Sequence, residues 1–302
     1  MAPLDTPPRA RPGAPDFGRD GTDWPHRAHS RFWPVDGITW HVQRFGAGPT
    51  ALLLHGTGAA THSFMDLAPR MAETHDVIAI DLPGHGFTQS PAHIRPSLET
   101  VTRRIAALLD ALNAAPDLMI GHSAGAAIML ALADHMPTKP SQLVSLNGAL
   151  SPFPGLTKFL FPAAAQLLTV GGVTAHLMAR SARNRSRVLA LLEQTGGAPD
   201  DRFVDRYWRL LQAPAHVSGT LRLMANWDLS GMDPVLARTQ TPVLFLTGSQ
   251  DQAVDPGDAD RLARLSPLAR TVRLDRLGHL AHEQDAGRVW TTLEAERVRG
   301  RS

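Results

Sequence analysis

The sequence contains no cysteine in its 302 residues. This absence excludes disulfide bonds, a thiolate nucleophile and metal sites built on cysteine. Lysine is scarce as well, since it occurs only at Lys139 and Lys158, and arginine supplies nearly all of the positive charge. The 30 basic and 28 acidic residues are interspersed. Because no basic stripe results, we expect no nucleic-acid partner, while an acidic substrate or an anionic membrane surface stays open.

Long hydrophobic runs are also absent. Residues 1–21 are rich in Pro, Arg and Gly and lack the apolar run of a signal peptide. The longest stretch without a charge, residues 159–179, is interrupted by Gln166, two glycines and His176, which favours cap helices over a transmembrane segment. We therefore expect a cytoplasmic protein with no transmembrane segment, for which peripheral contact with a membrane stays open.

Short apolar runs bounded by turn residues recur along the chain, as is typical of buried parallel strands. They cover residues 51–54, 77–80, 118–120, 143–146 and 243–246. Segments with helical spacing lie between them, the clearest beginning after Ser97, which is suited to cap a first turn. An antiparallel hairpin turned by Asp36 and Gly37 precedes them. The pattern predicts the α/β class, with a mostly parallel central sheet flanked by helices.

The alternation of strand and helix is lost from residue 151 to residue 241, where helical segments are punctuated by Pro and Gly. We interpret this region as a helical cap inserted between two strands. The predicted organisation is a flexible N-terminal lead-in (1–21), a core (22–150 and 242–296), the cap (151–241) and a flexible C-terminus (297–302).

A serine stands between two glycines directly after the strand 118–120 and directly before a helical run. The residues Gly121, His122, Ser123, Ala124 and Gly125 match the nucleophile elbow, G-x-S-x-G. In that motif the serine occupies a strained turn, so the residues two before and two after it must be small for strand and helix to approach. The alternative is an ordinary tight turn, but its position between strand and helix favours Ser123 as a nucleophile.

A serine hydroxyl needs a base, and the base needs an acid that holds its tautomer. Asp251 follows the strand 243–246, and His279 follows a strand near residues 271–274, in the chain order that this arrangement uses. Three nearby carboxylates compete with Asp251, but Asp255, Asp258 and Asp260 fall at or inside the next helix start, where they would act as caps. Asn147, after the earlier strand, is an amide and cannot replace the acid.

The oxyanion of an acyl-transfer intermediate needs two backbone N–H donors. Ala124 would provide one, and Thr57, in the glycine-rich turn after the strand 51–54, would provide the other. The glycines of this turn could instead serve only the turn itself. His282 lies three residues past His279, a spacing that could also place two histidines on one metal ion. Because no further ligand converges on them, we expect a structural role for His282, no metal site and no cofactor.

Five motifs occur in the order HGTGAATHSF, DLPGHGFTQS, GHSAG, GSQDQAV and LGHLAHE, and with them the chain resembles the α/β-hydrolase superfamily. More narrowly, GRDGTDWPHRAHSRF, HVQRFG, LLLHGTGAATHSF, GHSAGAAIMLAL, LNGALSPFPG and WDLSGMDPVLAR resemble the BchO branch, the magnesium-chelatase accessory proteins of bacteriochlorophyll synthesis. The resemblance implies the triad Ser123, Asp251 and His279. It also implies a role at the stage of magnesium insertion into protoporphyrin in photosynthetic bacteria, with a magnesium-chelatase subunit as a candidate partner.

These observations favour a serine hydrolase that acts on an ester-like or large hydrophobic substrate, such as a porphyrin. Aromatic residues predicted in the cap would line an apolar pocket, although plain core packing is the alternative for each. The pocket candidates are Phe153, Phe159, Trp208 and Trp227. Two other functions stay open: a non-catalytic accessory protein that binds a porphyrin for magnesium chelatase, and a general carboxylesterase with no role in pigment synthesis.

Overall fold

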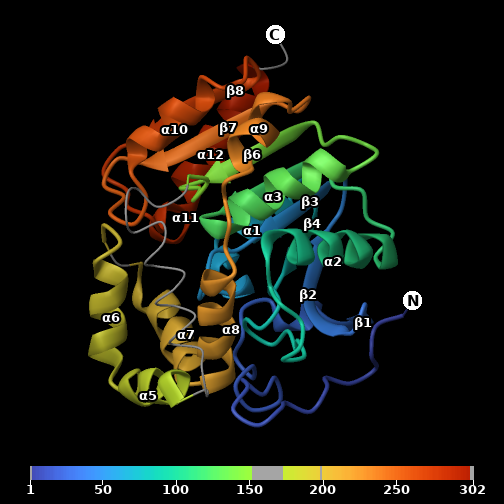
Figure 1. Cartoon of the computed structure of the whole chain (residues 1–302), viewed down its shortest axis with the longest axis vertical. Coiled ribbons are helices and arrows are strands. Elements are labelled where there is room, and N and C mark those ends of the chain that lie inside the picture. The colour runs from blue at the N-terminus through green and yellow to red at the C-terminus, as the bar shows by residue number, and fades with distance from the viewer. Residues whose placement is uncertain (1, 152–172, 198, 300–302) are drawn as a thin grey trace.

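A single mixed sheet forms the centre of the molecule (Figure 1). The computed structural model describes residues 2–151, 173–197 and 199–299, and in that part of the chain the strand order is β1-β2-β4-β3-β5-β6-β7-β8. The strands are β1 (Ser30–Val35), β2 (Ile38–Gly46), β3 (Thr50–Leu54), β4 (Asp76–Ile80), β5 (Leu118–His122), β6 (Gln142–Leu146), β7 (Val243–Gly248) and β8 (Ala269–Leu274). From β4 to β8 all neighbours are parallel, which confirms the predicted sheet.

The antiparallel edge is the hairpin of β1 and β2. Its turn residues, Asp36 and Gly37, both have positive φ, as a two-residue hairpin turn of type I′ requires. The second strand of the hairpin then pairs antiparallel with β4. The predicted hairpin is thus confirmed, and it joins the parallel strands to form one continuous sheet.

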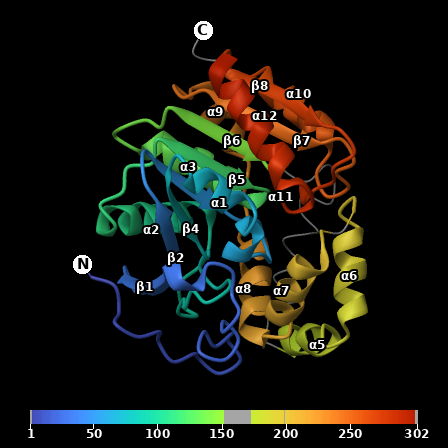
Figure 2. The same ribbon diagram turned by 180° about the vertical axis from the view of Figure 1, so that it is seen from behind.

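Helices cover both faces of the sheet (Figures 1 and 2). One face carries α2 (Leu98–Ala111), α3 (Ala124–His135), α9 (Met232–Ala237) and α10 (Pro256–Ala263). The other carries α1 (Leu67–Ala72), α11 (Ala281–Gln284) and α12 (Ala286–Arg299). Of two short 3₁₀ turns, η1 (Arg27–His29) has no buried residue, whereas η2 (Thr61–Phe64) contributes Phe64 to the second layer. Ser97 caps α2 by accepting a hydrogen bond from Thr100 N, as predicted.

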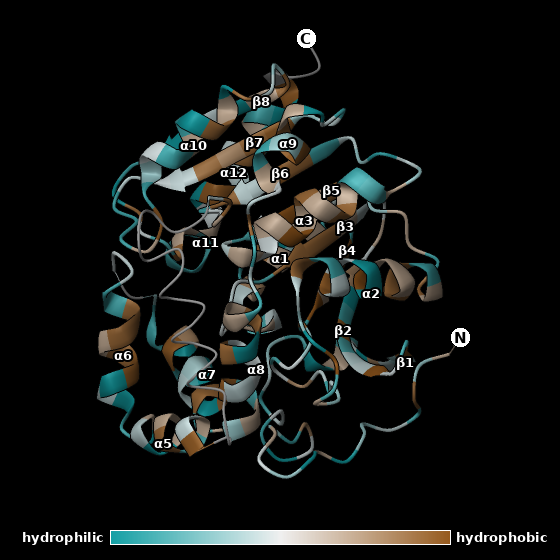
Figure 3. Ribbon diagram, in the orientation of Figure 1, coloured by the Kyte–Doolittle hydropathy of each residue, from teal (hydrophilic) through white to brown (hydrophobic). Residues whose placement is uncertain are grey.

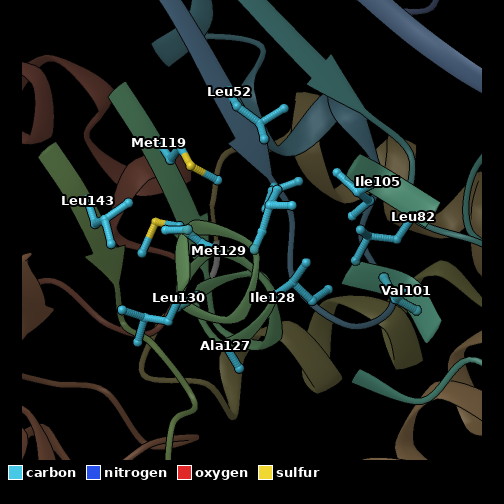
Figure 4. Close-up of a cluster of buried hydrophobic side chains, with 14 of the residues drawn as sticks. Leu52, Leu82, Val101, Ile105, Met119, Ala127, Ile128, Met129, Leu130 and Leu143 are labelled. Atoms are coloured by element: carbon cyan, nitrogen blue, oxygen red, sulfur yellow. The ribbon is translucent and has the colours of Figure 1, made fainter. Parts of the chain in front are cut away.

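Alternate residues of the strands enter the two core layers, because successive side chains of a strand point to opposite faces. In β3, Leu52 packs against α2 and α3, whereas Leu53 packs against α1 and α12. Figure 4 shows Leu52 and Met119 of the sheet facing Ile128 of α3. α3 and the strands beside it are mainly coloured as apolar in Figure 3, whereas α6 (Arg185–Glu193) and α10 show hydrophilic faces. α3 is therefore buried on most sides, and it holds the turn at Ser123, which joins it to β5.

The cap contains α5 (Val173–Ser181), α6, α7 (Asp201–Leu211) and α8 (Pro214–Ala225), grouped at one end of the molecule (Figures 1 and 2). Its predicted extent, residues 151–241, needs a correction at the C-terminal end. α9 falls within that range, yet its apolar residues pack into the core layer beside α3. This packing does not follow from the residue pattern, because α9 is helical like the cap and only its burial in the core layer separates the two.

Both predicted flexible ends also differ from the structure. In the N-terminal segment, Phe17 is buried against Phe32 and Phe87, and Leu4 N donates to Phe32 O. At the other end α12 continues to Arg299, and Arg297 donates to His75. Pro and Arg content predicted flexible ends, but Leu4, Phe17 and Arg297 contact remote residues. Residues 300–302 lie outside the described residues.

Candidate active site

Ser123 lies at the sharp turn between β5 and α3, with φ 51° and ψ −119°. This is a strained conformation for a residue with a side chain. The turn is held on both sides: Ser123 N donates to Leu146 O at 3.0 Å, and Ala149 N donates to Ser123 O at 3.1 Å. The position of the serine is therefore fixed by the sheet and by the start of α3.

The two glycines of the elbow are required by space. A Cβ atom at Gly125 would lie 2.2 Å from Leu54 O, and one at Gly121 would lie 2.4 Å from Gly125 O. Neither contact is tolerable, so β3, β5 and α3 approach as closely as they do only because these residues lack a side chain. The prediction that both positions must be small is confirmed.

Asp251 and His279 form a buried pair at the ends of β7 and β8. His279 Nδ1 lies 2.9 Å from Asp251 Oδ2. The same oxygen accepts from Asn147 Nδ2 at 2.8 Å, while Oδ1 accepts from Ala253 N at 2.8 Å and Val254 N at 2.9 Å. Four donors thus orient the carboxylate, which in turn fixes the histidine tautomer with its proton on Nδ1.

The competing carboxylates have other roles. Asp255 caps α10 by accepting from Gly257 N, as predicted. Asp258 and Asp260 pair with Arg261 and Arg273 respectively. Among these carboxylates it is Asp251 that contacts His279, and its role as the catalytic acid stays a prediction.

The loop of His279 contacts the elbow that carries Ser123, the predicted nucleophile, but no hydrogen bond joins these two residues in the described part of the chain. Among the described residues, neither Ser123 Oγ nor His279 Nε2 has a hydrogen-bond partner. The imidazole of His122, the residue next to the serine, lies 4.8 Å from that of His279, and its Nε2–H donates to His279 O at 3.0 Å. His122 therefore links the elbow to the histidine loop, a role that its place in the motif did not reveal.

The turn after β3 lies against the serine. A Cβ atom at Gly56 would be 3.0 Å from Ser123 Cβ, so the backbone of this turn packs closely against Ser123. Within the described chain, the amides of Thr57 and Ala124 donate no hydrogen bond. Two free N–H groups near a serine suit the stabilisation of an oxyanion, and their use for this purpose stays a prediction.

Buried histidines hold this turn in place. His55 donates from Nδ1 to Gly56 O at 2.7 Å. His216, from α8 of the cap, donates from Nε2 to Gly58 O at 3.0 Å and accepts from Gly86 N at 3.0 Å. Burial lowers the pKa of His216 to about 4, so its ring is neutral near pH 7 and can accept and donate at once. No spacing in the sequence connected His216 to this turn.

The backbones of α8 and the loop after β4 meet at two glycines. A Cβ atom at Gly219 would lie 2.1 Å from Gly84 O. The same loop is held at its base by Asp81, which accepts hydrogen bonds from Thr61 N and Phe87 N. The motif after β4, residues 81–88, was expected to be structural, and its contact with Gly219 shows that α8 of the cap packs against it.

A second polar cluster is buried behind the site. Ser63 Oγ lies 2.9 Å from His282 Nε2 and also donates to Glu283, which accepts from Tyr207 at 2.8 Å. Burial raises the pKa of Glu283 to about 8 and lowers that of His282 to about 3. The described residues contain no group of three or more His, Asp or Glu placed to hold a metal ion. His282 thus joins η2 to α11 and does not pair with His279.

The predicted pocket residues lie in apolar clusters where they are described. Trp208 of α7 packs against the apolar cluster that includes residues of α6, and its indole N–H donates to Arg183 O. Trp227 packs against the main core layer. These positions correspond to the core-packing alternative, and a contribution to a pocket stays a prediction. Phe153 and Phe159 lie outside the described residues. A separate groove of about 940 Å³ between α2, α3 and α9 is lined by none of Ser123, Asp251 and His279.

The strand order, the elbow at Ser123 and the loops of Asp251 and His279 are together typical of one class of proteins, the α/β hydrolases. The profile of the α/β hydrolase fold family matches residues 49–286, so the chain belongs to the α/β-hydrolase family. Within that family it belongs to the branch of the magnesium-chelatase 30 kDa subunit. The protein of that name from Rhodobacter capsulatus is 39% identical over 263 residues, which are 86% of this chain and 92% of that protein.

More distant proteins share the same architecture. The pimeloyl-[acyl-carrier protein] methyl ester esterase of Methylococcus capsulatus is 29% identical over 263 residues, covering 82% of this chain and 95% of that one. A solved α/β hydrolase fold protein from Burkholderia ambifaria superposes with a TM-score of 0.73 at 21% identity, over 87% and 96% of the two chains. In the described part of this chain, every helix is too short or too polar to cross a membrane.

Proposed function

We propose that the chain is a serine hydrolase that cleaves an ester-like bond in a large hydrophobic substrate. The observation that carries this proposal is the buried Asp251–His279 pair, held by four donors on the carboxylate beside a serine in a strained turn. Strain at a functional residue persists only where the surrounding structure enforces it. A tight turn without catalytic use would not require this conformation.

Each group would have one role in acyl transfer. His279 Nε2 takes the proton of Ser123 Oγ as the oxygen attacks the carbonyl carbon, and Asp251 stabilises the imidazolium that forms. The amides of Thr57 and Ala124 donate to the oxyanion. His279 then protonates the leaving alcohol, and a water molecule, deprotonated by the same ring, releases the acid and restores the hydroxyl.

Proton transfer from Ser123 to His279 needs a movement that brings the two side chains together. Because no hydrogen bond joins Ser123 to His279 in the described structure, a rotation of the serine side chain would have to bring Oγ to Nε2. Catalytic hydrogen bonds are often long or poorly aligned without substrate and tighten when it binds. The geometry is thus compatible with a resting enzyme.

The substrate is proposed from the relatives. The similar protein of Rhodobacter capsulatus is named as a subunit of magnesium chelatase, which supports a role in bacteriochlorophyll synthesis at the magnesium-protoporphyrin stage and a chelatase subunit as partner. An apolar pocket beneath the cap would suit such a substrate.

A non-catalytic accessory protein is the second candidate. This candidate is favoured by the name of the Rhodobacter capsulatus relative, a subunit of magnesium chelatase, and by the absence of a Ser123–His279 hydrogen bond among the described residues. Such a protein would bind a porphyrin or a chelatase subunit and would not use the nucleophile. A general carboxylesterase outside pigment synthesis is the third, supported by the ester-cleaving relative from Methylococcus capsulatus.

One set of variants separates the three functions. A fluorophosphonate probe should label the wild-type protein and fail to label Ser123→Ala. Both forms should then be tested for restoring pigment synthesis in a photosynthetic bacterium that lacks the gene. Failure of a folded Ser123→Ala variant to restore pigment would support hydrolysis, and restoration by that variant would support the accessory role. Labelling of wild type together with normal pigment in the deletion strain would leave the general esterase.

A further inference from the structure

The turn that joins α6 to α7 in the cap reaches the loops that carry the acid and the base (Figures 1 and 2). Thr195 O accepts from His279 N at 2.9 Å and from Gln252 N at 3.3 Å. One carbonyl of the cap thus bridges the backbone of the base to that of the acid loop. One donor, His279 N, belongs to the Asp251–His279 pair itself, and the other, Gln252 N, belongs to the residue after Asp251.

Close backbone packing accompanies this bridge. Gly196 has φ +102°, and a Cβ atom there would lie 2.0 Å from Gln250 O and 3.1 Å from Gly278 Cα. In turn, a Cβ atom at Gly278 would lie 2.4 Å from Gly196 O. The cap turn is therefore wedged between the two loops, and only glycine permits this approach.

The side chain of Gln284, on α11 of the core, also connects the cap turn to the loop of His279. Gln284 of α11 donates from Nε2 to Gly197 O at 2.5 Å and accepts from Gly278 N at 2.8 Å. It therefore connects the cap to the residue just before His279. The two ends of its amide have different partners, so they can be removed separately.

From these contacts we infer that Thr195, Gly196 and Gln284 are positioning residues, which set the placement of His279 and the acid loop through the cap. The backbone of Ser123 is held by the sheet and α3, and the elbow contacts the base loop through the hydrogen bond from His122 to His279 O. A displacement of the cap turn would hence move the base relative to the nucleophile. The catalytic consequence of this inference rests on the proposed hydrolase function, whereas the mechanical linkage does not.

Three variants test the linkage. Gln284→Ala removes both hydrogen bonds, and Gln284→Glu keeps an acceptor for Gly278 N while placing an acceptor against Gly197 O. Gly196→Ala forces a side chain into the wedge. Gly231→Ala is the matched control, since it makes the same change at a glycine with negative φ and no atom within 4 Å of the added Cβ.

The first measurement needs no activity. Hydrogen exchange by mass spectrometry should show faster exchange in peptides covering residues 249–254 and 276–281 for Gln284→Ala and Gly196→Ala, and wild-type rates for Gly231→Ala. Unchanged exchange in both peptides of folded Gln284 variants would overturn the linkage. If Gly196→Ala does not fold, the two Gln284 variants decide.

The second measurement follows phosphonylation of Ser123 against pH. Because small misplacements of catalytic groups are costly, we expect the rate to fall about tenfold or more in Gln284→Ala, with an altered pH profile and a similar melting temperature. Gln284→Glu should fall between Gln284→Ala and wild type. A lower melting temperature with unchanged rate and pH profile would show a purely structural role and contradict positioning. Absence of labelling in wild type would instead refute the proposed function and leave the exchange result to judge the linkage.

Discussion

At the scale of single residues, position in a loop matters more than residue type. Asp251 and Asp255 are both carboxylates after β7, yet one orients a histidine and the other caps a helix. Asp251 lies in the loop, where Asn147 also donates to it, whereas Asp255 lies at the start of α10. This pair of carboxylates provides an internal control for catalysis.

Asp251→Asn should abolish most of the activity. An amide cannot stabilise the imidazolium and favours the wrong histidine tautomer, so we expect kcat to fall about 10³- to 10⁴-fold with little change in KM. The measurement is steady-state hydrolysis of a p-nitrophenyl ester. Asp255→Asn preserves the cap of α10 and should keep wild-type kcat. Equal losses in the two variants would contradict the assignment of the acid.

Glu283 should make stability fall as pH rises. Its pKa is about 8 in the folded protein because of burial, and 4.5 in the unfolded chain, so the folded state binds the extra proton between these values. This carboxyl should therefore lower the free energy of unfolding by about 1 kcal/mol between pH 7 and pH 8, and by about 1.4 kcal/mol between pH 7 and pH 9, where the effect levels off. Histidines whose pKa is lowered by burial, such as His216 and His282, still bind some protons in the unfolded chain at pH 7 and oppose this fall, but they do so equally in wild type and in a Glu283 variant.

Glu283→Gln is the test of this pH dependence. The amide oxygen can still accept from Ser63 and Tyr207, but it carries no titrating group. Urea denaturation at pH 7 and pH 9 should show a smaller loss of stability in the variant than in wild type. The same loss in both proteins would show that Glu283 does not titrate in this range.

At the scale of elements, α8 supports the proposed oxyanion loop. His216 fills the gap between Gly58 and Gly86, and Gly219 lets α8 approach the loop after β4. The cap is thus in contact with all three loops around the site, at the oxyanion turn through α8 and at the acid and base through Thr195. Its placement influences each of them.

His216→Leu should separate this support from general packing. The apolar side chain keeps the volume but leaves Gly86 N–H and Gly58 C=O buried without a partner, which costs about 1–3 kcal/mol for each such group. We expect lower stability by urea denaturation, and a fall in kcat that exceeds any rise in KM because the Thr57 amide shifts. His93→Leu, at an exposed position, should change neither. Normal kcat in a destabilised His216→Leu protein would show that His216 does not position the loop.

At the scale of the whole molecule, the N-terminal segment holds core and cap together. Phe17 packs with Phe32 of β1, Phe87 of the loop after β4 and Leu210 of α7. Asp23, a few residues later, pairs with Arg206 and Arg209 of α7. These ion pairs are partly exposed and contribute little, so the aromatic cluster is the main attachment.

Phe17→Ala should therefore destabilise the protein far more than a change in a flexible segment. Removal of a buried phenylalanine ring costs about 3–5 kcal/mol. Urea denaturation gives the value, and Leu4→Ala, at a more exposed position of the same segment, should cost much less. A loss below about 1 kcal/mol for Phe17→Ala would return the segment to the flexible lead-in that its composition suggests.

The sequence by itself determined the features that depend on neighbouring residues. Strands, the hairpin turn, the cap of α2 and the nucleophile elbow all follow from local periodicity, from glycine between a strand and a helix, and from residues that favour turns. The order of Ser123, Asp251 and His279 could be read because each candidate follows a strand, and parallel strands bring their ends to one edge.

Only the tertiary structure decided which remote groups meet. Asn147 and Asp251 are 104 residues apart, and His216 reaches Gly58 across 158 residues. Contacts between remote elements also explain the close packing at Gly196, the burial of Phe17 and the position of α9 in the core layer. Such contacts depend on how whole elements pack, and packing leaves no periodic signal at the residues that take part.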